Sequence, residues 1–133
     1  MRICLIGYGY WGKNLARVFG KDLVGICDYN QDNLDKAKEL YDVQYFSKWE
    51  DLYQSNLEYD TVAIATKADT HFDLANKFLI NKKNIWLEKP ACIKIKNIEQ
   101  LIKIRGDNKV FVDHTFVYHP AIQKIKSLDI GTP

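Results

Sequence analysis

The chain has 133 residues, of which 47% are hydrophobic and 27% are charged, and its formal net charge is +2. This length suffices for one ordinary domain with its own core, and the composition is typical of a globular protein. The small basic excess argues against a nucleic-acid partner, and no apolar run is long enough to suggest a membrane span.

A glycine-rich turn follows the first predicted strand, residues 3–6, and precedes a helix predicted at residues 13–19. In a strand–turn–helix unit the pattern G-x-G-x-x-G indicates dinucleotide binding, with glycines that permit a tight turn, approach of a pyrophosphate and close helix packing. The helix N-terminus would attract the phosphates. The alternatives are a turn without a ligand and, for the aromatic residues, packing on the sheet edge. The predicted cofactor-binding residues of the turn are Gly7, Tyr8, Gly9, Tyr10, Trp11 and Gly12.

A second predicted strand, residues 23–27, ends at Asp28. This carboxylate lies about 20 residues after the first glycine, where a dinucleotide fold places the acid that binds the adenosine ribose hydroxyls. A carboxylate there would repel a 2′-phosphate, and no arginine follows closely, so NAD is predicted over NADP. The alternative is a turn or helix-capping role, although Asn30 can serve as the cap and leave Asp28 free.

The rest of the chain alternates between helices and strands. Helices are predicted at residues 31–40, 48–54, 70–81, 95–104 and 120–128, and strands at residues 43–46, 61–65, 84–87 and 110–112. Ser47 is expected to cap the second of these helices. This alternation predicts one Rossmann-type, doubly wound α/β domain over residues 1–133, with a mainly parallel six-stranded sheet and helices on both faces. Residues expected to point inward from the helices, or to form an apolar side, include Leu40, Ile98, Leu101, Ile102, Ile122, Ile125 and Leu128.

The three cysteines, Cys4, Cys27 and Cys92, lack metal-ligand spacing, so no metal site is predicted. Two of them lie in apolar strand segments, and we expect buried, reduced thiols. The N-terminus enters a strand directly, without the organisation of a signal peptide. Together these features favour a cytoplasmic protein.

Ionisable residues gather where the later strands end. In an open parallel sheet, ligands bind beyond the carboxyl ends of the strands, so Lys89 and His114 are candidates to exchange a proton with a substrate hydroxyl or carbonyl. Each has an alternative: Lys89 as a solvated loop lysine, and His114 as a hydrogen-bonded structural histidine. His71 has the alternative of packing on the first turn of its helix. A cis bond before Pro90 is possible.

The chain resembles the Gfo/Idh/MocA oxidoreductases over nearly its whole length. The resemblance rests on the glycine turn, on Asp28, on Thr66 with His71, and on the triplet Glu88-Lys89-Pro90. Members of this family are NAD(P)-dependent dehydrogenases of sugars, inositols and sugar nucleotides. The resemblance implies that Lys89 is catalytic, beside the nicotinamide and substrate, with His114 nearby. It also implies that the loop running along the cofactor contains Thr66, Lys67 and His71, and that Glu88 belongs to the cofactor site.

The stretches at residues 10–15 and 114–120 resemble the sugar-nucleotide branch of the family, which acts on UDP-N-acetylhexosamine derivatives. Two departures lie near the expected site, because Lys67 replaces a usual proline and Asp113 replaces a usual glycine. Family members continue into a second domain that supplies much of the substrate pocket and usually the oligomer interface, and we expect that domain to be absent from this chain.

The predicted function is NAD-dependent oxidation of a sugar or sugar-nucleotide hydroxyl to a ketone. A homo-oligomer or a partner chain is expected to supply the substrate domain if the chain is catalytic as it stands. The alternative is a non-catalytic NAD-binding module, or a truncated fragment, that acts as a sensor or partner subunit.

Overall fold

The computed structural model describes residues 1–128 of the chain. Strands and helices alternate along it, joined by short 3-10 turns at Gly20–Asp22, Ala68–Thr70 and Thr115–Tyr118. The elements are β1 (Ile3–Ile6), α1 (Tyr10–Phe19), β2 (Leu23–Cys27), α2 (Gln31–Lys38), β3 (Gln44–Phe46), α3 (Trp49–Gln54), β4 (Thr61–Ile64), α4 (His71–Ile80), β5 (Asn84–Leu87), α5 (Ile95–Ile104), β6 (Val110–Val112) and α6 (Pro120–Lys126).

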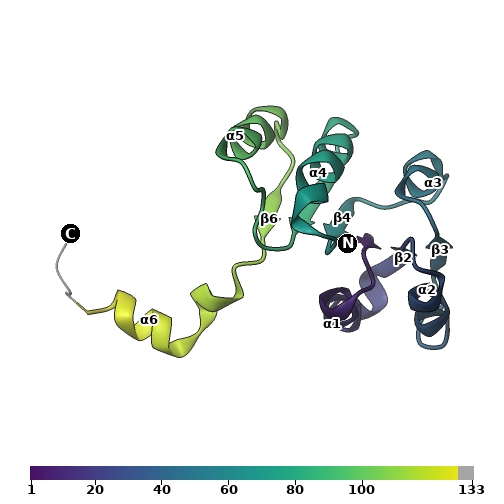
Figure 1. The fold of residues 1–133 in the computed structure, drawn as a ribbon, viewed down its shortest axis with the longest axis horizontal. Coiled ribbons are helices and arrows are strands. Elements are labelled where there is room, and N and C mark those ends of the chain that lie inside the picture. Colours follow the sequence, from purple (N-terminus) through teal and green to yellow (C-terminus); the bar gives the residue numbers. More distant parts are fainter. Residues whose placement is uncertain (129–133) are drawn as a thin grey trace.

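The strands form one six-stranded sheet in the order β3-β2-β1-β4-β5-β6, and every adjacent pair is parallel. Helices α1 and α2 cover one face, and α3, α4 and α5 cover the other (Figure 1). The strand order reverses between β1 and β4, which defines the switch point of a doubly wound sheet. The predicted fold class, a Rossmann-type α/β domain with a parallel six-stranded sheet, is confirmed.

The side-chain alternation of β1 explains why helices are needed on both faces. Ile3 and Leu5 join the core beneath α1 and α2, whereas Cys4 and Ile6 join the core beneath α3, α4 and α5. Successive side chains of a strand point to opposite faces, so a strand that is apolar throughout must be covered twice. All four residues of β1 are buried.

Several helix boundaries and inward faces differ from expectation. Helix α1 begins at Tyr10, three residues early, because Gly9 already has the extended backbone of an N-cap. Helix α2 ends at Lys38, which leaves Leu40 exposed.

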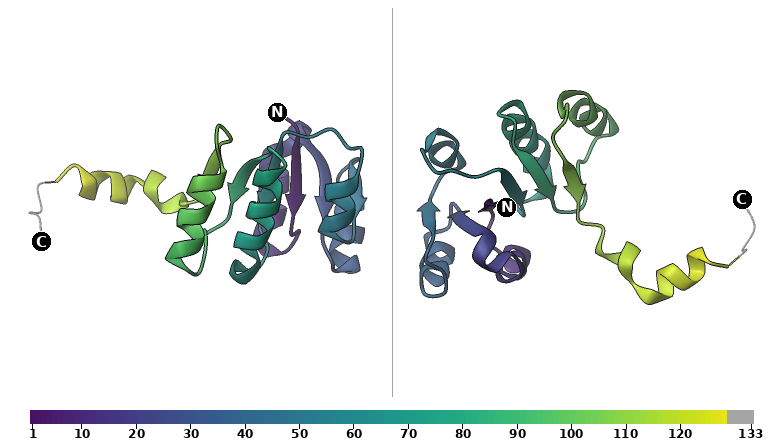
Figure 2. Two further views of the ribbon diagram at one scale, coloured as in Figure 1. Left: turned by 90° about the horizontal axis from the view of Figure 1, so that it is seen from above. Right: turned by 180° about the vertical axis from the view of Figure 1, so that it is seen from behind.

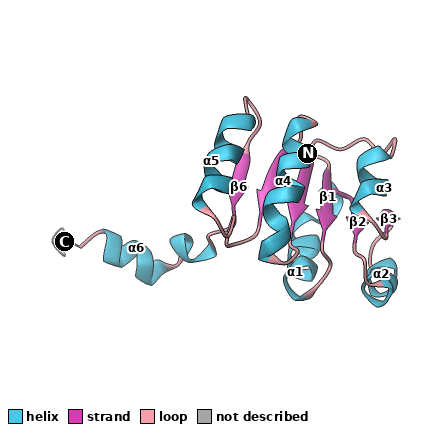
Figure 3. Cartoon of the chain, turned by 45° about the horizontal axis from the view of Figure 1, so that its top comes forward, coloured by secondary structure: helices cyan, strands magenta, loops and turns pink. Residues whose placement is uncertain are grey.

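Of the expected inward residues of α5, only Leu101 is buried, whereas Ile102 is 61% exposed. Helix α5 lies over β6 at the edge of the sheet (Figure 3), where no further strand or helix of residues 1–128 covers its outer side.

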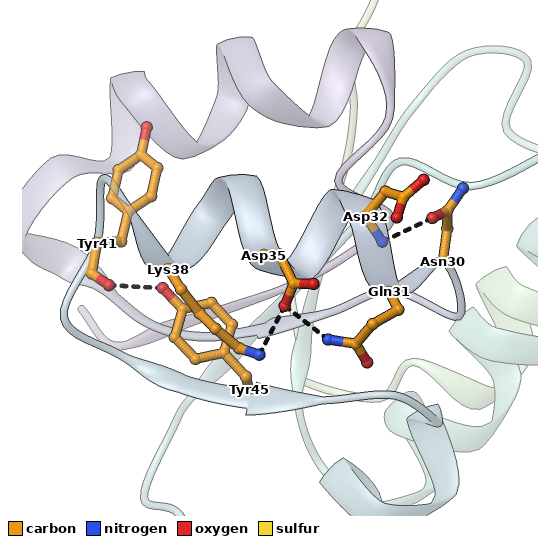
Figure 4. Close-up of polar contacts among 7 residues, drawn as sticks. All are labelled: Asn30, Gln31, Asp32, Asp35, Lys38, Tyr41 and Tyr45. Carbon is orange, nitrogen blue, oxygen red and sulfur yellow. Dashed lines mark hydrogen bonds and ion pairs between the residues drawn. The ribbon is translucent and has the colours of Figure 1, made fainter.

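Helix capping follows the prediction at α2 and departs from it at α3. The Asn30 side chain accepts a hydrogen bond of 2.9 Å from the Asp32 N–H, as expected of a cap (Figure 4). Ser47 does not cap α3, because the helix starts one residue later, with Lys48 as its N-cap. Beyond the C-terminal end of α2, the Tyr45 hydroxyl donates to the Tyr41 carbonyl and ties β3 to the segment that follows the helix (Figure 4).

The segment after β6 leaves the body of the domain. The 3-10 turn Thr115–Tyr118 and α6 extend away from the sheet (Figures 1 and 2). The expected apolar side of α6 is therefore not buried: Ile122, Ile125 and Leu128 are 42%, 48% and 49% exposed. Large apolar side chains of the preceding turn, including Phe116 and Tyr118, are exposed as well.

Within residues 1–128, no helix has the length and apolar character needed to cross a membrane.

Candidate functional site

A pocket of about 810 Å³ opens where the central strands end, beside the switch point between β1 and β4. Parallel sheets bind ligands at this position because the connecting loops diverge to opposite faces there. The pocket is large enough for a nucleotide-sized ligand. Five of the predicted cofactor residues line it: Gly7, Gly9, Asp28, Thr66 and Lys67.

The three glycines of the turn have different structural roles. Gly7 has a φ of +95°, and a Cβ there would lie 2.6 Å from the Ala65 carbonyl oxygen. A Cβ on Gly12 would lie 1.9 Å from the Gly7 carbonyl oxygen, so the start of α1 packs directly on the turn. A Cβ on Gly9 would meet no atom within 4 Å among the described residues, and Gly9 lines the pocket. The fold thus requires two of the glycines, whereas the third leaves open space at the pocket.

The N-terminus of α1 suits an anion in that open space. Gly9 is the N-cap, no described side chain caps the helix, and its first turn contains no acidic residue. The first N–H groups of a helix lack partners inside the helix, and its dipole is positive at this end. The turn therefore fits the pyrophosphate of a dinucleotide.

Asp28 is buried, being 6% exposed, and yet lines the pocket. Its carboxylate accepts hydrogen bonds from the Tyr8 N–H at 2.7 Å, the Asn30 N–H at 2.8 Å and the Asn33 amide at 3.1 Å. Asn30 caps α2, as expected, so Asp28 is free of the capping role, but its carboxylate is engaged in these three bonds. A carboxylate has about four acceptor positions, so roughly one remains for a ribose hydroxyl. Asp28 also ties the glycine turn to the loop after β2.

The loop after β4 is held by its own side chains. The Thr70 hydroxyl donates to the Lys67 carbonyl at 2.7 Å and lies 2.6 Å from the Thr66 hydroxyl. His71 is 1% exposed and does not line the pocket. Its Nδ1 lies 2.9 Å from the Pro90 carbonyl oxygen, and its Nε2 lies 3.1 Å from the Thr66 carbonyl oxygen. His71 therefore joins the loops after β4 and β5 from behind the pocket lining.

The aromatic residues of the glycine turn separate into core and surface. Tyr8 is 2% exposed and packs edge-on against Tyr41, and burial raises the pKa of its hydroxyl to about 12. Tyr10 is exposed, and Trp11 is partly exposed. None of the three lines the pocket, nor does Gly12. Tyr8 therefore belongs to the core beneath α1 and α2 and does not cover the pocket.

Glu88 and Lys89 follow β5, and His114 follows β6, the next strand in the sheet. The last residues of these strands, Leu87 and Val112, are paired, so the two loops begin side by side. Lys89 and His114 are exposed, whereas Glu88 is buried. All three lie outside the pocket lining, farther along the same edge of the sheet. The peptide bond before Pro90 is cis.

The pocket also has lining residues that the sequence analysis missed. Ser47, Lys48 and Trp49 come from the connection after β3. The rule that ligands bind beyond strand ends would have pointed to them, since residues 43–46 were expected to form a strand. Lys77 lies two turns into α4, and nothing in its sequence context marks it as a pocket residue.

The reversed strand order, the glycine turn and the pocket at the switch point define a dinucleotide-binding Rossmann domain. Residues 1–116 match the family model described as the oxidoreductase family with an NAD-binding Rossmann fold, GFO_IDH_MocA. The chain belongs to this family, and NAD is the cofactor of the domain.

Similar proteins include the UDP-N-acetylglucosamine 3-dehydrogenase of Acidithiobacillus ferrooxidans, 26% identical over all of this chain and 43% of its own length. The myo-inositol 2-dehydrogenase of Thermotoga maritima is 28% identical over 77% of this chain and 32% of its own length. The fold is similar to that of the WlbA dehydrogenase of Bordetella pertussis, which was solved with NADH and UDP-GlcNAcA, with a TM-score of 0.86. The two sequences are 23% identical, and the match covers 94% of this chain and 40% of the WlbA chain. The chain thus spans less than half the length of each.

Proposed function

We propose that this chain is the cofactor-binding part of an NAD-dependent dehydrogenase that oxidises a hydroxyl of a sugar or sugar nucleotide to a ketone. The observation that carries the proposal is the position of Lys89. Lys89 is exposed at the carboxyl end of β5, and the pocket that fits a dinucleotide lies at the same end of the parallel strands. The relatives that act on a UDP-sugar and on an inositol favour a polyhydroxylated substrate.

In the proposed reaction, Lys89 reacts as the neutral amine, which hydrogen-bonds the reacting hydroxyl, accepts its proton and becomes the ammonium, and His114 lies on the neighbouring loop to assist. NAD, when bound, supplies the hydride acceptor. The glycine turn and the N-terminus of α1 would hold the pyrophosphate. Asp28 would accept a hydrogen bond from the adenosine ribose and disfavour the 2′-phosphate of NADP through charge repulsion.

Further parts of the enzyme would complete the substrate pocket. The part of each relative that this chain matches is less than half of that relative's length. The exposed apolar side of α6, with Ile122 and Ile125, would pack against an additional domain or a partner chain. We place the protein in the cytoplasm, in accord with three buried free cysteines, which suit a reducing compartment.

The test compares the chain with its Lys89→Ala variant. We expect NAD affinity, measured by calorimetry, to be unchanged, and any NADH formation with UDP-N-acetylglucosamine or myo-inositol to be abolished. Lys103→Ala, an exposed lysine of α5, is the matched control. Turnover that survives in Lys89→Ala would contradict the proposed role. Tight NAD binding without turnover in the unsubstituted chain, at high protein concentration, would favour a non-catalytic NAD-binding module instead.

A further inference from the structure

Two acidic side chains are buried together where β5 and β6 end. Glu88 is 6% exposed and Asp113 is 7% exposed. Each directly follows its strand, and the preceding residues Leu87 and Val112 are paired across the sheet. The Asp113 N–H donates to the Leu87 carbonyl at 2.9 Å, which continues the pairing of the two strands by one residue. The backbone therefore holds the two carboxyl groups side by side.

The hydrogen bonds of Glu88 are incomplete when both acids are ionised. Its Oε2 accepts a bond of 3.1 Å from the Lys89 N–H. Its Oε1 is fully buried and receives no hydrogen bond from any described residue. The Asp113 carboxyl acts on the Glu88 carboxyl through its charge and through side-chain hydrogen bonding. Two carboxylates are acceptors only, so they repel and leave this oxygen unsatisfied. One proton between them turns one acid into a donor and satisfies the pair.

The surrounding charges do not neutralise two anions. Asp113 and Lys89 are the charged side chains of the described residues that act on the Glu88 carboxyl, and Lys89 is exposed to solvent. Of the nearby histidines, His71 has both ring nitrogens against the carbonyls of Pro90 and Thr66, while His114 is exposed. Burial, together with the Asp113 charge, raises the pKa of Glu88 to about 7, whereas the Lys89 N–H and charge act to lower it.

We propose that Glu88 and Asp113 share a single proton at neutral pH, and that this singly charged pair holds the backbone of Lys89 in place at the end of β5. Asp113 is then a positioning residue that acts through Glu88. Loss of the shared proton puts two negative charges in contact, and their repulsion displaces the Glu88 carboxyl together with the Lys89 backbone that it holds. The shared proton does not depend on the reaction proposed above. Only the catalytic value of positioning Lys89 rests on that proposed function.

The shared proton is tested by following the side-chain carboxyl carbons of the full chain by NMR across a pH series. We expect two coupled steps, the upper one near neutral pH. In Asp113→Asn the Glu88 step should move down by about one unit or more, because a neutral amide donates to the carboxylate in place of a second acid. Asp107→Asn, an exposed position at the opposite end of the sheet, should leave it unchanged. Independent titration of both acids below about pH 5, the ordinary range of carboxyls, would overturn the proposal.

The positioning role is tested at the Lys89 amide. We expect its proton resonance to shift with the same midpoint as the upper carboxyl step, and to become independent of pH across that range in Glu88→Gln. The glutamine amide mimics the protonated acid while keeping a carbonyl oxygen for the Lys89 N–H. An amide that does not follow the carboxyl step in the unsubstituted chain would overturn the role. Neither readout requires turnover, so failure of the dehydrogenase proposal is distinguished from failure of this one.

Discussion

Asp28 serves the fold and the ligand site through one carboxylate. Three of its hydrogen bonds go to the chain itself, including the 2.7 Å bond from the Tyr8 N–H that anchors the glycine turn. Most of its acceptor capacity is therefore committed before a ribose approaches. The shape of the pyrophosphate site and the recognition of the ribose depend on the same residue.

Asp28→Ala should weaken NAD binding by tenfold or more, which corresponds to about 1.4 kcal/mol. It should also lower the free energy of unfolding by about 1–3 kcal/mol, because the buried donors lose their acceptor. Calorimetry with NAD and urea unfolding measure the two effects. Asp32→Asn, an exposed acid of α2 outside the pocket lining, serves as the control. Unchanged NAD affinity in Asp28→Ala would count against the ribose role.

Gly9 and Gly12 allow the needs of the fold and of the ligand to be separated. In Gly12→Ala the new methyl group would collide with the Gly7 carbonyl, so we expect a loss of stability of about 1–3 kcal/mol, the usual cost of overpacking. Gly9→Ala meets open space, so stability should fall by no more than about 1 kcal/mol, the cost of alanine at an N-cap, while NAD affinity falls because the methyl group occupies the approach of the pyrophosphate. Equal NAD affinity in Gly9→Ala and the unsubstituted chain would remove Gly9 from the site.

At the scale of elements, the loops after β4, β5 and β6 form one connected structure. His71 joins the loop after β4 to that after β5, and the pair of Glu88 and Asp113 joins the loops after β5 and β6. Lys89 lies between these two connections. Its position is therefore set by buried polar groups that do not themselves line the pocket.

The buried pair makes folding stability depend on pH. The pKa of Glu88 is raised from 4.5 to about 7 by burial, so the folded chain binds more protons at this site than the unfolded chain does between these values. The stabilisation is complete below about pH 4.5 and is lost as the pH rises through about 7.

Glu88→Gln removes this titration. Relative to the unsubstituted chain, we therefore expect the variant to become progressively more stable between pH 5 and pH 8. Urea unfolding of both proteins at matched pH values gives the difference directly. Stability curves that run parallel across this range would show that Glu88 has an ordinary pKa in the fold.

At the scale of the whole molecule, the sequence was sufficient to predict the architecture. Apolar strand segments that end in glycine or ionisable residues predicted the parallel sheet, and most strand limits agree to within one residue. The inner face of α5 was not predictable from periodicity alone. Ile98 and Leu101 are both apolar at helical spacing, and only the edge position of β6 decides that Leu101 is buried while Ile98 stays 37% exposed.

The candidate site was predictable only in part, because its residues meet through tertiary contacts. The glycine turn and Asp28 carry local patterns, and Gly7, Gly9 and Asp28 line the pocket. The hydrogen bonds of Asp28 and the proximity of Asp113 to Glu88 depend on how neighbouring strands align, which a single sequence does not specify. Lys77 reaches the pocket from α4 without any local signal.

Substrate turnover by the chain alone is an indirect test, because α6 projects from the domain and the chain spans less than half the length of its relatives. Binding of NAD is the direct one, because it depends only on the described domain. Calorimetric titration of the full chain with NAD should show one site per chain, with weaker binding of NADP and with affinity reduced in Gly9→Ala. No binding of NAD at millimolar concentration by the folded chain would contradict the account.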